Sequence, residues 1–388
     1  MKRKVKLILT LLSMVILFSC GYETHVINTV HKDGSVTRKV TMKTSDEEFE
    51  PEKYRVPVDS TWQIQIDTEV NEAGDTSRIL TAEKYFANVD EINEEYINDK
   101  GSNQDLKRKA YFSKSFKWFT TVFRYSETVE KVMTVTCPAS DFLSEKELKF
   151  FYLPGNVKTE LKNGTDSLKY KALSDTVDMK SEIWLWTGFV RQWIEIFYDR
   201  FGNHPDLTIN KEEMLSKEPD FVNQIIEFEQ ADEEYEEEFL QDLEEEGFDE
   251  EALQSLEKEG KKDDVDDIEI LVTSVLGSKF YSSFTTELDS SMSVLENMTE
   301  PFFSADIYDM EVRMPGKIIA SSGYVNTVPD SENSSGILWT VQGDYFLTQQ
   351  YEMWAESQVN NYWAWIITAL FILFVITGFV IRPKKEKD

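Results

Sequence analysis

The chain has 388 residues, of which 41% are apolar and 13% aromatic, enough to bury a substantial core. Its 41 Lys and Arg residues against 72 Asp and Glu give a net charge of −31, which excludes nucleic acid as a natural partner, because binding phosphates needs clustered cations. Two cysteines and three histidines are too few for an iron–sulfur cluster, a Cys/His zinc site or a disulfide framework. We therefore expect neither a metal nor another cofactor.

The N-terminus has the pattern of a secretory signal peptide over residues 1–19. Four cations in the first six residues precede an apolar run from Leu7 to Phe18. The run ends in Leu17-Phe18-Ser19-Cys20-Gly21, which resembles the lipobox of bacterial lipoproteins, although Phe18 stands where that motif usually has a small residue. The resemblance implies that Cys20 is lipidated and becomes the mature N-terminus. A plain signal peptide or an uncleaved anchor is the alternative.

Residues 23–85 have the pattern of strands. The pair Asp33-Gly34 between two alternating segments predicts a hairpin, and a second hairpin is expected from Ile64 to Leu80. Residues 116–135 alternate between two apolar faces, and we expect one long strand there. Ser144 and Glu147 then form a capping box that begins a short helix ending near Pro154.

The region from about 181 to 300 has helical periodicity. Its first helix carries a stripe of large apolar side chains and should end at Gly202. Packing in a core is the more common role of such a stripe, with a ligand groove or a membrane-surface helix as alternatives. The stripe consists of Trp184, Trp186, Phe189, Trp193, Ile196 and Phe197.

The same region contains an unusually acidic segment. Residues 218–257 include eighteen Asp and Glu residues and no Lys or Arg. One interpretation is a docking face for a basic envelope protein, or a surface that attracts divalent cations loosely. The other is a solvated face that keeps the domain soluble. Residues 263–267 lack the central Gly of a calcium loop, so a specific calcium site is not expected. The acidic face is centred on Glu233, Glu234, Glu236, Glu237 and Glu238.

Strands return after residue 300, in the segments 307–313, 317–322, 336–341 and 351–358. We therefore predict an α+β fold in which an antiparallel sheet combines N- and C-terminal strands and the helical acidic region, about 181–300, is an insertion. The domain would cover residues 20–361. A division into two domains at about residue 180 is the alternative.

The C-terminus predicts one transmembrane helix over residues 362–381. No charge occurs from Val359 to Ile381, and about twenty helical residues cross the roughly 30 Å hydrocarbon layer. A buried core helix is the alternative, but it would carry a polar stripe. The aromatic residues before the helix and the cations after it place the tail, residues 382–388, in the cytoplasm. These flanking residues are Tyr362, Trp363 and Trp365, then Arg382, Lys384, Lys385 and Lys387.

Three short stretches resemble LppM-type membrane-anchored lipoproteins. They are Asp33-Gly34-Ser35-Val36, the segment from Arg313 through Met314-Pro315-Gly316 to Ile319, and Gly336-Ile337-Leu338-Trp339. The whole chain also resembles uncharacterised lipoproteins of the Bacteroidota. The resemblance implies a small α+β domain facing the cell envelope, similar to lipid-headgroup-binding modules, and not an enzyme. It assigns no individual binding residue.

Catalytic motifs are missing from the sequence. Cys137 would be the sole thiol left after lipidation of Cys20, and a buried, inert side chain is the expectation for it. No Walker A loop, GxGxxG, HExxH or GxSxG occurs. We expect no catalytic residues and no enzyme, but a doubly anchored inner-membrane lipoprotein with a periplasmic domain that binds or scaffolds. Its partners would be lipid, through Cys20 and the C-terminal helix, and a basic envelope protein. An envelope hydrolase using Asp and Glu carboxylates is the alternative.

Overall fold

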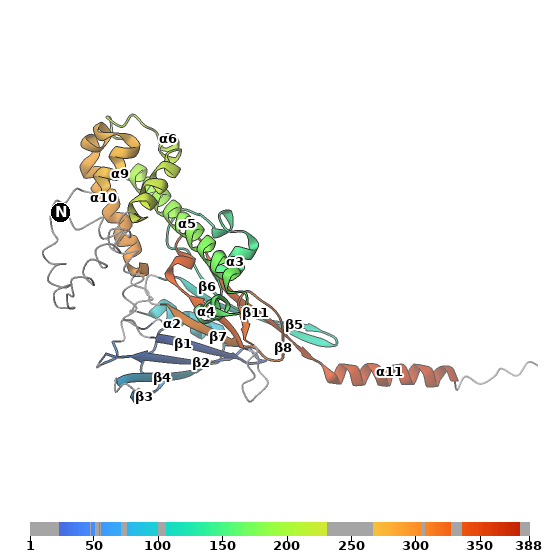
Figure 1. The fold of residues 1–388 in the computed structure, drawn as a ribbon. Coiled ribbons are helices and arrows are strands. Elements are labelled where there is room, and N and C mark those ends of the chain that lie inside the picture. The colour runs from blue at the N-terminus through green and yellow to red at the C-terminus, as the bar shows by residue number, and fades with distance from the viewer. Residues whose placement is uncertain are drawn as a thin grey trace, which may run out of the picture. The chain divides into compact units, whose positions relative to one another are not determined.

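The computed structural model describes residues 23–46, 48–50, 54, 56–70, 76–99, 106–230, 267–303, 307–326 and 336–380. They belong to two compact units. The helical unit contains Glu130–Ile307 and Gln342–Tyr351, and the sheet unit contains Tyr22–Val129, Tyr308–Val341 and Glu352–Asp388. The α+β fold class is confirmed (Figure 1).

The first sheet of the sheet unit joins the two ends of the chain, as predicted. Among the described residues it has seven strands in the order β3-β4-β2-β1-β7-β10-β9. Neighbours are antiparallel except β1 and β7, which run parallel with Thr29 opposite Arg313. This pair departs from the antiparallel expectation. The long connection that parallel neighbours need runs from β2 through β6 (Thr120–Val129) and then through residues 130–307 of the helical unit. The strands are β1 (Glu23–Val30), β2 (Val36–Thr44), β3 (Gln63–Val70), β4 (Thr76–Phe86), β7 (Tyr308–Arg313), β9 (Tyr324–Asn326) and β10 (Gly336–Val341).

The second sheet contains β5 (Arg108–Lys117), β6 (Thr120–Val129), β11 (Tyr351–Asn360) and β8 (Lys317–Ser321), in the order β5-β6-β11-β8. The long strand predicted over residues 116–135 is wrong. The chain reverses at Trp118 and Phe119, so that Lys117 lies opposite Thr120, and β6 ends at Val129. The turn lacks the Asn-Gly or Asp-Gly pair that identifies a two-residue hairpin, and its aromatic residues continue the alternation of a strand.

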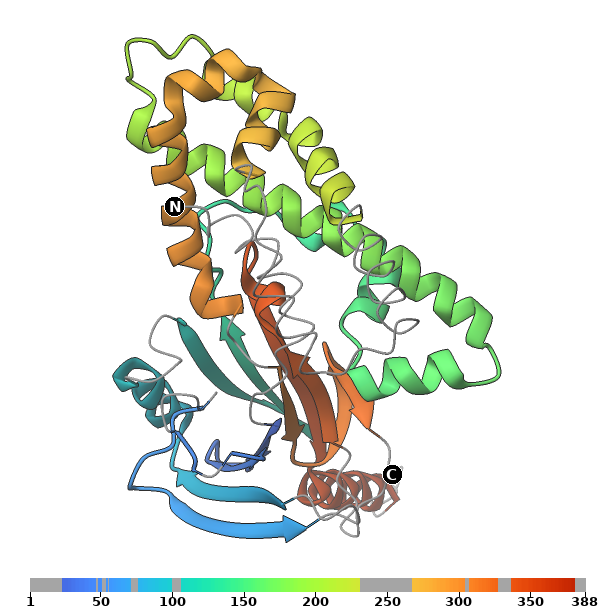
Figure 2. The same cartoon turned by 60° about the vertical axis from the view of Figure 1, so that its left-hand side comes forward.

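Inward-facing side chains alternate along the strands and form the core of the sheet unit. On β1 the buried residues are Thr24, Val26, Asn28 and Val30, and on β6 they include Phe123 and Tyr125. Helix α2 (Val89–Asn98) begins after Asn88, whose side chain accepts hydrogen bonds from Asp90 N and Glu91 N. It packs on β5 (Figure 2).

The helical unit has α5 (Ser167–Phe201) as its longest described helix, which begins earlier than the periodicity indicated. It ends where predicted, with Gly202 N donating to Tyr198 O. The capping box of Ser144 and Glu147 is present at the start of α3. The other described elements are η2 (Ala139–Asp141), α3 (Glu145–Phe151), α4 (Gly155–Asn163), α6 (Lys211–Leu215), α9 (Asp267–Leu276), α10 (Ser278–Phe303) and η3 (Gly343–Phe346).

The aromatic stripe of α5 is core, as expected. All six of its side chains are buried. The three indole N–H groups donate to partners inside the unit: Trp184 to the carbonyl of Cys137, Trp186 to Glu229 and Trp193 to Ser291. A tryptophan can be buried at low cost only when its N–H finds such a partner.

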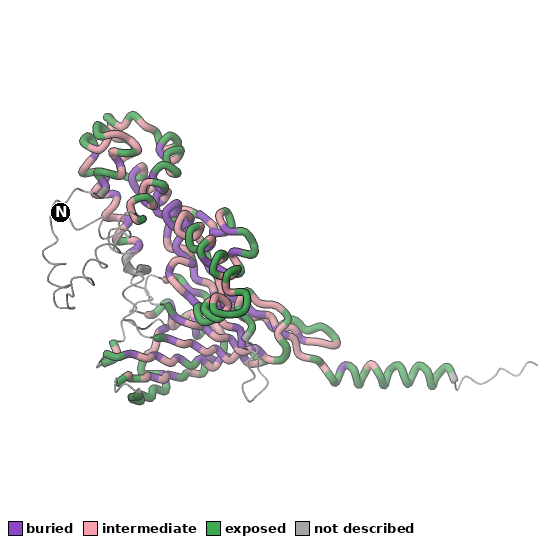
Figure 3. The backbone as a smooth tube through the Cα atoms, viewed as in Figure 1, coloured by how far each residue is buried: buried purple, intermediate pink, exposed green. Residues whose placement is uncertain are grey.

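Helix α11 (Tyr362–Val380) belongs to the sheet unit and follows β11 directly. It is the one described helix long and apolar enough to cross a membrane. Ala364 is its only fully buried side chain among those described, and almost every other residue is exposed (Figure 3). A buried core helix is therefore not what the structure contains.

Candidate functional site

An open cavity of about 780 Å³ lies at one end of the first sheet, where β1 and β7 finish. The turn between β1 and β2 forms one wall, Tyr85 of β4 another, and the residues after β7 a third. Its lining consists of Thr29, Val30, His31, Lys32, Asp33, Ser35, Tyr85, Arg313, Met314 and Pro315.

Hydrogen bonds within the β1–β2 turn fix its shape. Asp33 Oδ1 accepts from Ser35 N at 3.1 Å and from Ser35 Oγ at 2.7 Å, and both bonds lower the pKa of Asp33. Gly34 has φ of +99°, a backbone conformation that disfavours a side chain. A Cβ there would also lie 2.8 Å from the ring of Phe112. The turn is therefore rigid at the place where it lines the cavity.

The cavity is locally basic although the whole chain is strongly acidic. Its lining contains the cations of Lys32 and Arg313 against one carboxylate, Asp33, together with the imidazole of His31. Arg313 Nε donates to Glu311 Oε1 at 2.7 Å, which orients the guanidinium at the end of β7. One carboxylate held anionic does not form an acid–base pair, whereas cations, hydroxyls and the exposed ring of Tyr85 suit binding of a polar or anionic molecule.

The cavity lies near the end of the sheet unit from which α11 begins. Pro315, in its wall, accepts a hydrogen bond through its carbonyl from Ser357 Oγ at 2.8 Å. Ser357 is on β11, four residues before Asn361, and α11 begins at the next residue. Four strand residues span about 13 Å.

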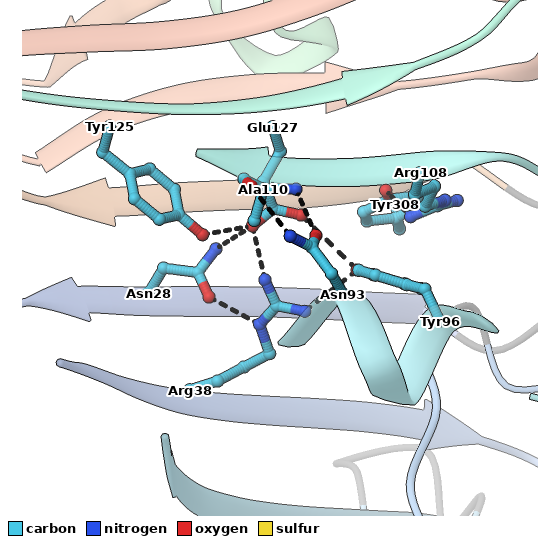
Figure 4. A network of polar contacts seen from close by, with 9 residues as sticks. All are labelled: Asn28, Arg38, Asn93, Tyr96, Arg108, Ala110, Tyr125, Glu127 and Tyr308. Carbon is cyan, nitrogen blue, oxygen red and sulfur yellow. Dashed lines mark hydrogen bonds and ion pairs between the residues drawn. The ribbon is translucent and has the colours of Figure 1, made fainter. Parts of the chain in front are cut away.

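A buried polar network connects the two sheets of this unit (Figure 4). Glu127 of β6 accepts hydrogen bonds from Asn28 at 3.1 Å and from Tyr125 at 2.6 Å, and it forms an ion pair with Arg38 of β2. Arg38 also donates to Asn28 Oδ1 at 2.7 Å and to Tyr96 OH at 2.9 Å. Burial is the largest single influence and disfavours the charge of Arg38, but Glu127, Tyr96 and Tyr125 together outweigh it and raise the pKa of Arg38 well above its usual range.

A second guanidinium extends the network without a carboxylate of its own. Arg108 is 9% exposed, donates to Tyr308 OH, and lies 5.4 Å from the ring centre of Tyr96. Burial raises the pKa of Tyr308 to about 12, so this phenol stays neutral. Because the network is enclosed between the sheets, we interpret it as a device that fixes their relative position and not as a site open to ligands.

The predicted site residues fall in different places. Cys20 and the acidic residues Glu233, Glu234, Glu236, Glu237 and Glu238 lie outside the described residues. Cys137 is fully buried, as expected, and burial raises the pKa of its thiol. It lies beyond β6 in an irregular segment and not at the end of a strand.

The stretches Asp33–Val36 and Arg313–Ile319 both contribute to the cavity. Asp33 and Ser35 come from the first, and Arg313, Met314 and Pro315 from the second. Comparison of the chain with protein-family models, with curated proteins and with solved structures finds no match. Within the described part of the chain, no three His, Cys, Asp or Glu side chains are grouped so that they could hold a metal ion.

Sequence reasoning missed both the cavity and the network. A signal for the network was present, because Arg38 occupies the same face of its strand as Val36, Val40 and Met42. A charge at an inward-facing position predicts a buried partner. The cavity had no comparable signal, since its walls come from residues separated by more than two hundred positions in the chain.

Proposed function

We propose that this chain is a doubly anchored protein of the bacterial inner membrane, with lipid on Cys20, α11 across the bilayer, and an extracytoplasmic domain that binds a polar envelope molecule or scaffolds a partner protein. The observation that carries the proposal is the exposure of α11. Its 19 residues contain no charge and would reach about 28 Å, close to the hydrocarbon thickness. Water around such a surface would be strongly unfavourable, whereas acyl chains would not.

The orientation can be tested with a tag fused after Asp388. Protease added to spheroplasts should digest the domain while the tag survives until the membrane is permeabilised, because the cations after α11 favour the cytoplasmic side. Digestion of the tag in intact spheroplasts would contradict the orientation. Survival of both the domain and the tag in protease-treated spheroplasts would also contradict the proposed orientation.

The binding role can be tested at the cavity. A photo-crosslinking amino acid in place of Tyr85, whose side chain is exposed and lines the cavity, should capture a small polar or anionic envelope molecule in intact cells. Tyr111 on β5 is similarly exposed but outside the cavity, and it provides the matched control position. The adduct at position 85 should disappear in Arg313→Gln. Identical adducts at both positions would show that the cavity is not a binding site.

A further inference from the structure

The tip of the β5–β6 hairpin contacts the first two turns of α11 through aromatic side chains. Phe116 stacks on Trp363 with ring centres 6.0 Å apart, and Phe119 lies 4.3 Å from the ring of Trp365. Trp118 lies 5.6 Å from Trp363. These contacts form a cluster of five aromatic residues, three from the hairpin and two from the helix.

The cluster is not a core, because it remains largely uncovered. Phe116 is 57% exposed and Trp118 is 49% exposed, and Trp363 and Trp365 are similar. An exposed hairpin end of this composition is an aggregation hazard in water. Tryptophan is, in contrast, the residue that proteins concentrate at the interface between lipid and water.

The side chain of Trp118 contacts α11 beyond the first turn of that helix. Its indole N–H donates to Thr368 Oγ1 at 2.9 Å. Thr368 comes six residues after Tyr362, which corresponds to about 9 Å along the helix axis. If α11 crosses the bilayer from Tyr362 onward, Trp118 lies below the level at which the helix enters the lipid.

Three carbonyls of the hairpin tip are satisfied without water, by Asn361. Asn361 Nδ2 donates to the carbonyls of Lys117 and Trp118 at 3.1 and 3.3 Å. Asn361 N donates to the carbonyl of Phe119 at 2.8 Å, so three consecutive carbonyls of the turn have a partner. A turn in water does not need protein partners for its carbonyls, because water supplies them. A turn in lipid does need them, because each unpaired backbone group there costs several kcal/mol.

We propose that the tip of the β5–β6 hairpin, formed by Phe116, Trp118 and Phe119, inserts into the interfacial layer of the membrane that α11 crosses. The partner of this surface is the lipid bilayer, chosen by continuity with α11. Lys117, exposed at the end of β5, can extend its ammonium group back to the phosphates. The hairpin and the helix together would fix the sheet unit at a defined angle to the membrane. This inference rests on the proposed membrane anchoring by α11.

The test uses the full chain with Cys20→Ala, reconstituted in phosphatidylcholine vesicles, with one cysteine added for an environment-sensitive nitrobenzoxadiazole label. Trp118→Cys and Phe116→Cys report on the tip. Phe371→Cys, in the middle of α11, reports on the anchor, and Tyr111→Cys, exposed on the same strand as Phe116, is the matched control. The parent chain without an added cysteine controls for labelling of the buried Cys137.

Lipids with a nitroxide near the carboxyl end of the acyl chain should quench the label at both tip positions, and emission there should shift to shorter wavelength. The label at Tyr111 should instead be quenched by aqueous iodide. Quenching at Phe371 with a tip that behaves like Tyr111 would overturn the inference and leave the anchor intact. Lipid quenching at all four positions would also overturn it, because the strand would then lie flat on the bilayer. No lipid quenching at Phe371 would overturn the anchoring and the inference with it.

Discussion

Glu127 supplies the negative charge that balances Arg38 in the buried network, because it is the one carboxylate among the residues drawn there. Glu127→Gln keeps its shape but leaves the guanidinium of Arg38 without a counter-charge, beside a second one on Arg108. We expect a loss of about 3 to 5 kcal/mol in the free energy of unfolding, the usual cost of stranding a buried charge. Pulse proteolysis of the full chain in detergent along a urea gradient measures this loss.

The ion pair of Lys43 and Glu69 on the surface of the first sheet provides the matched control. Its partners are separated by 2.8 Å and both are well exposed, so Glu69→Gln should shift the urea midpoint little. Equal shifts for Glu69→Gln and Glu127→Gln would show that the buried network does not hold the sheets together.

The carboxyl of Asp344, in η3, predicts that the stability of the protein falls as the pH rises. Burial raises the pKa of its carboxyl to about 6, above the value of about 3.9 in an unfolded chain. The folded state therefore binds the proton more tightly, and this residue costs stability as the pH rises from about 4 through about 6. Asp344→Asn should raise the melting temperature at about pH 8 and change it little at about pH 4. A gain of the same size at both pH values in thermal scans would contradict this explanation.

At the level of elements, the turn between β7 and β8 depends on one glycine. Gly316 has φ of +86°, and a Cβ there would lie 2.5 Å from the carbonyl oxygen of Gln358 on the adjacent strand. Gly316→Ala should cost about 1 to 3 kcal/mol, because the left-handed conformation and the close approach both disfavour a side chain. Gly155→Ala, at a position with nothing within 4 Å, is the control and should leave the urea midpoint nearly unchanged.

Elements with a local signal were predictable from the sequence. The hairpin at Asp33-Gly34, the capping box at Ser144 and the end of α5 at Gly202 are confirmed, because turn and cap preferences act over a few residues. The β5–β6 turn was not predictable, because Trp118 and Phe119 are selected by their contacts with α11, more than two hundred residues later. The parallel pairing of β1 with β7 depends on equally distant contacts.

At the level of the whole molecule, the first question is whether two anchors act independently. Cys20→Ala should abolish metabolic labelling with a fatty-acid probe, because the lipobox resemblance assigns the lipid to this thiol. The variant should stay in the membrane fraction, since α11 is long and apolar enough to span the bilayer and would by itself retain the chain there. Absence of label on the wild-type protein, or release of the variant into the soluble fraction, would contradict the double anchor.

The charge of the whole molecule is distributed unevenly, and this bears on what it binds. The cavity lining has Lys32 and Arg313 against Asp33, while residues 218–257 carry eighteen carboxylates without a cation. Anionic ligands and basic partners would therefore be attracted to different parts of the chain. The sequence showed the acidic segment directly, whereas the basic cavity needed the fold to bring the β1–β2 turn and the end of β7 together.

Neutralising five residues of the acidic segment distinguishes a role in docking a partner from a role in keeping the domain soluble. Replacing Glu233, Glu234, Glu236, Glu237 and Glu238 by Gln keeps helix propensity nearly unchanged and relieves repulsion between like charges, so folding should survive. The control variant changes the same amount of charge elsewhere, with Gln at the exposed positions Glu83, Glu94, Glu130, Glu160 and Glu212. Both are compared with the parent by circular dichroism, aggregation rate and pull-down from crosslinked cells.

We expect both variants to keep every partner and the first to aggregate more readily, because five charges that are neighbours in the sequence and repel other copies of the chain are lost from one segment. Surface charge acts on association mainly through steering, so a docking face would show itself by a salt-dependent association rate that the first variant loses and the control keeps. Loss of one specific partner in the first variant alone, with an unchanged circular dichroism spectrum, would contradict the solubilising role and identify the acidic face as a binding surface for a basic protein.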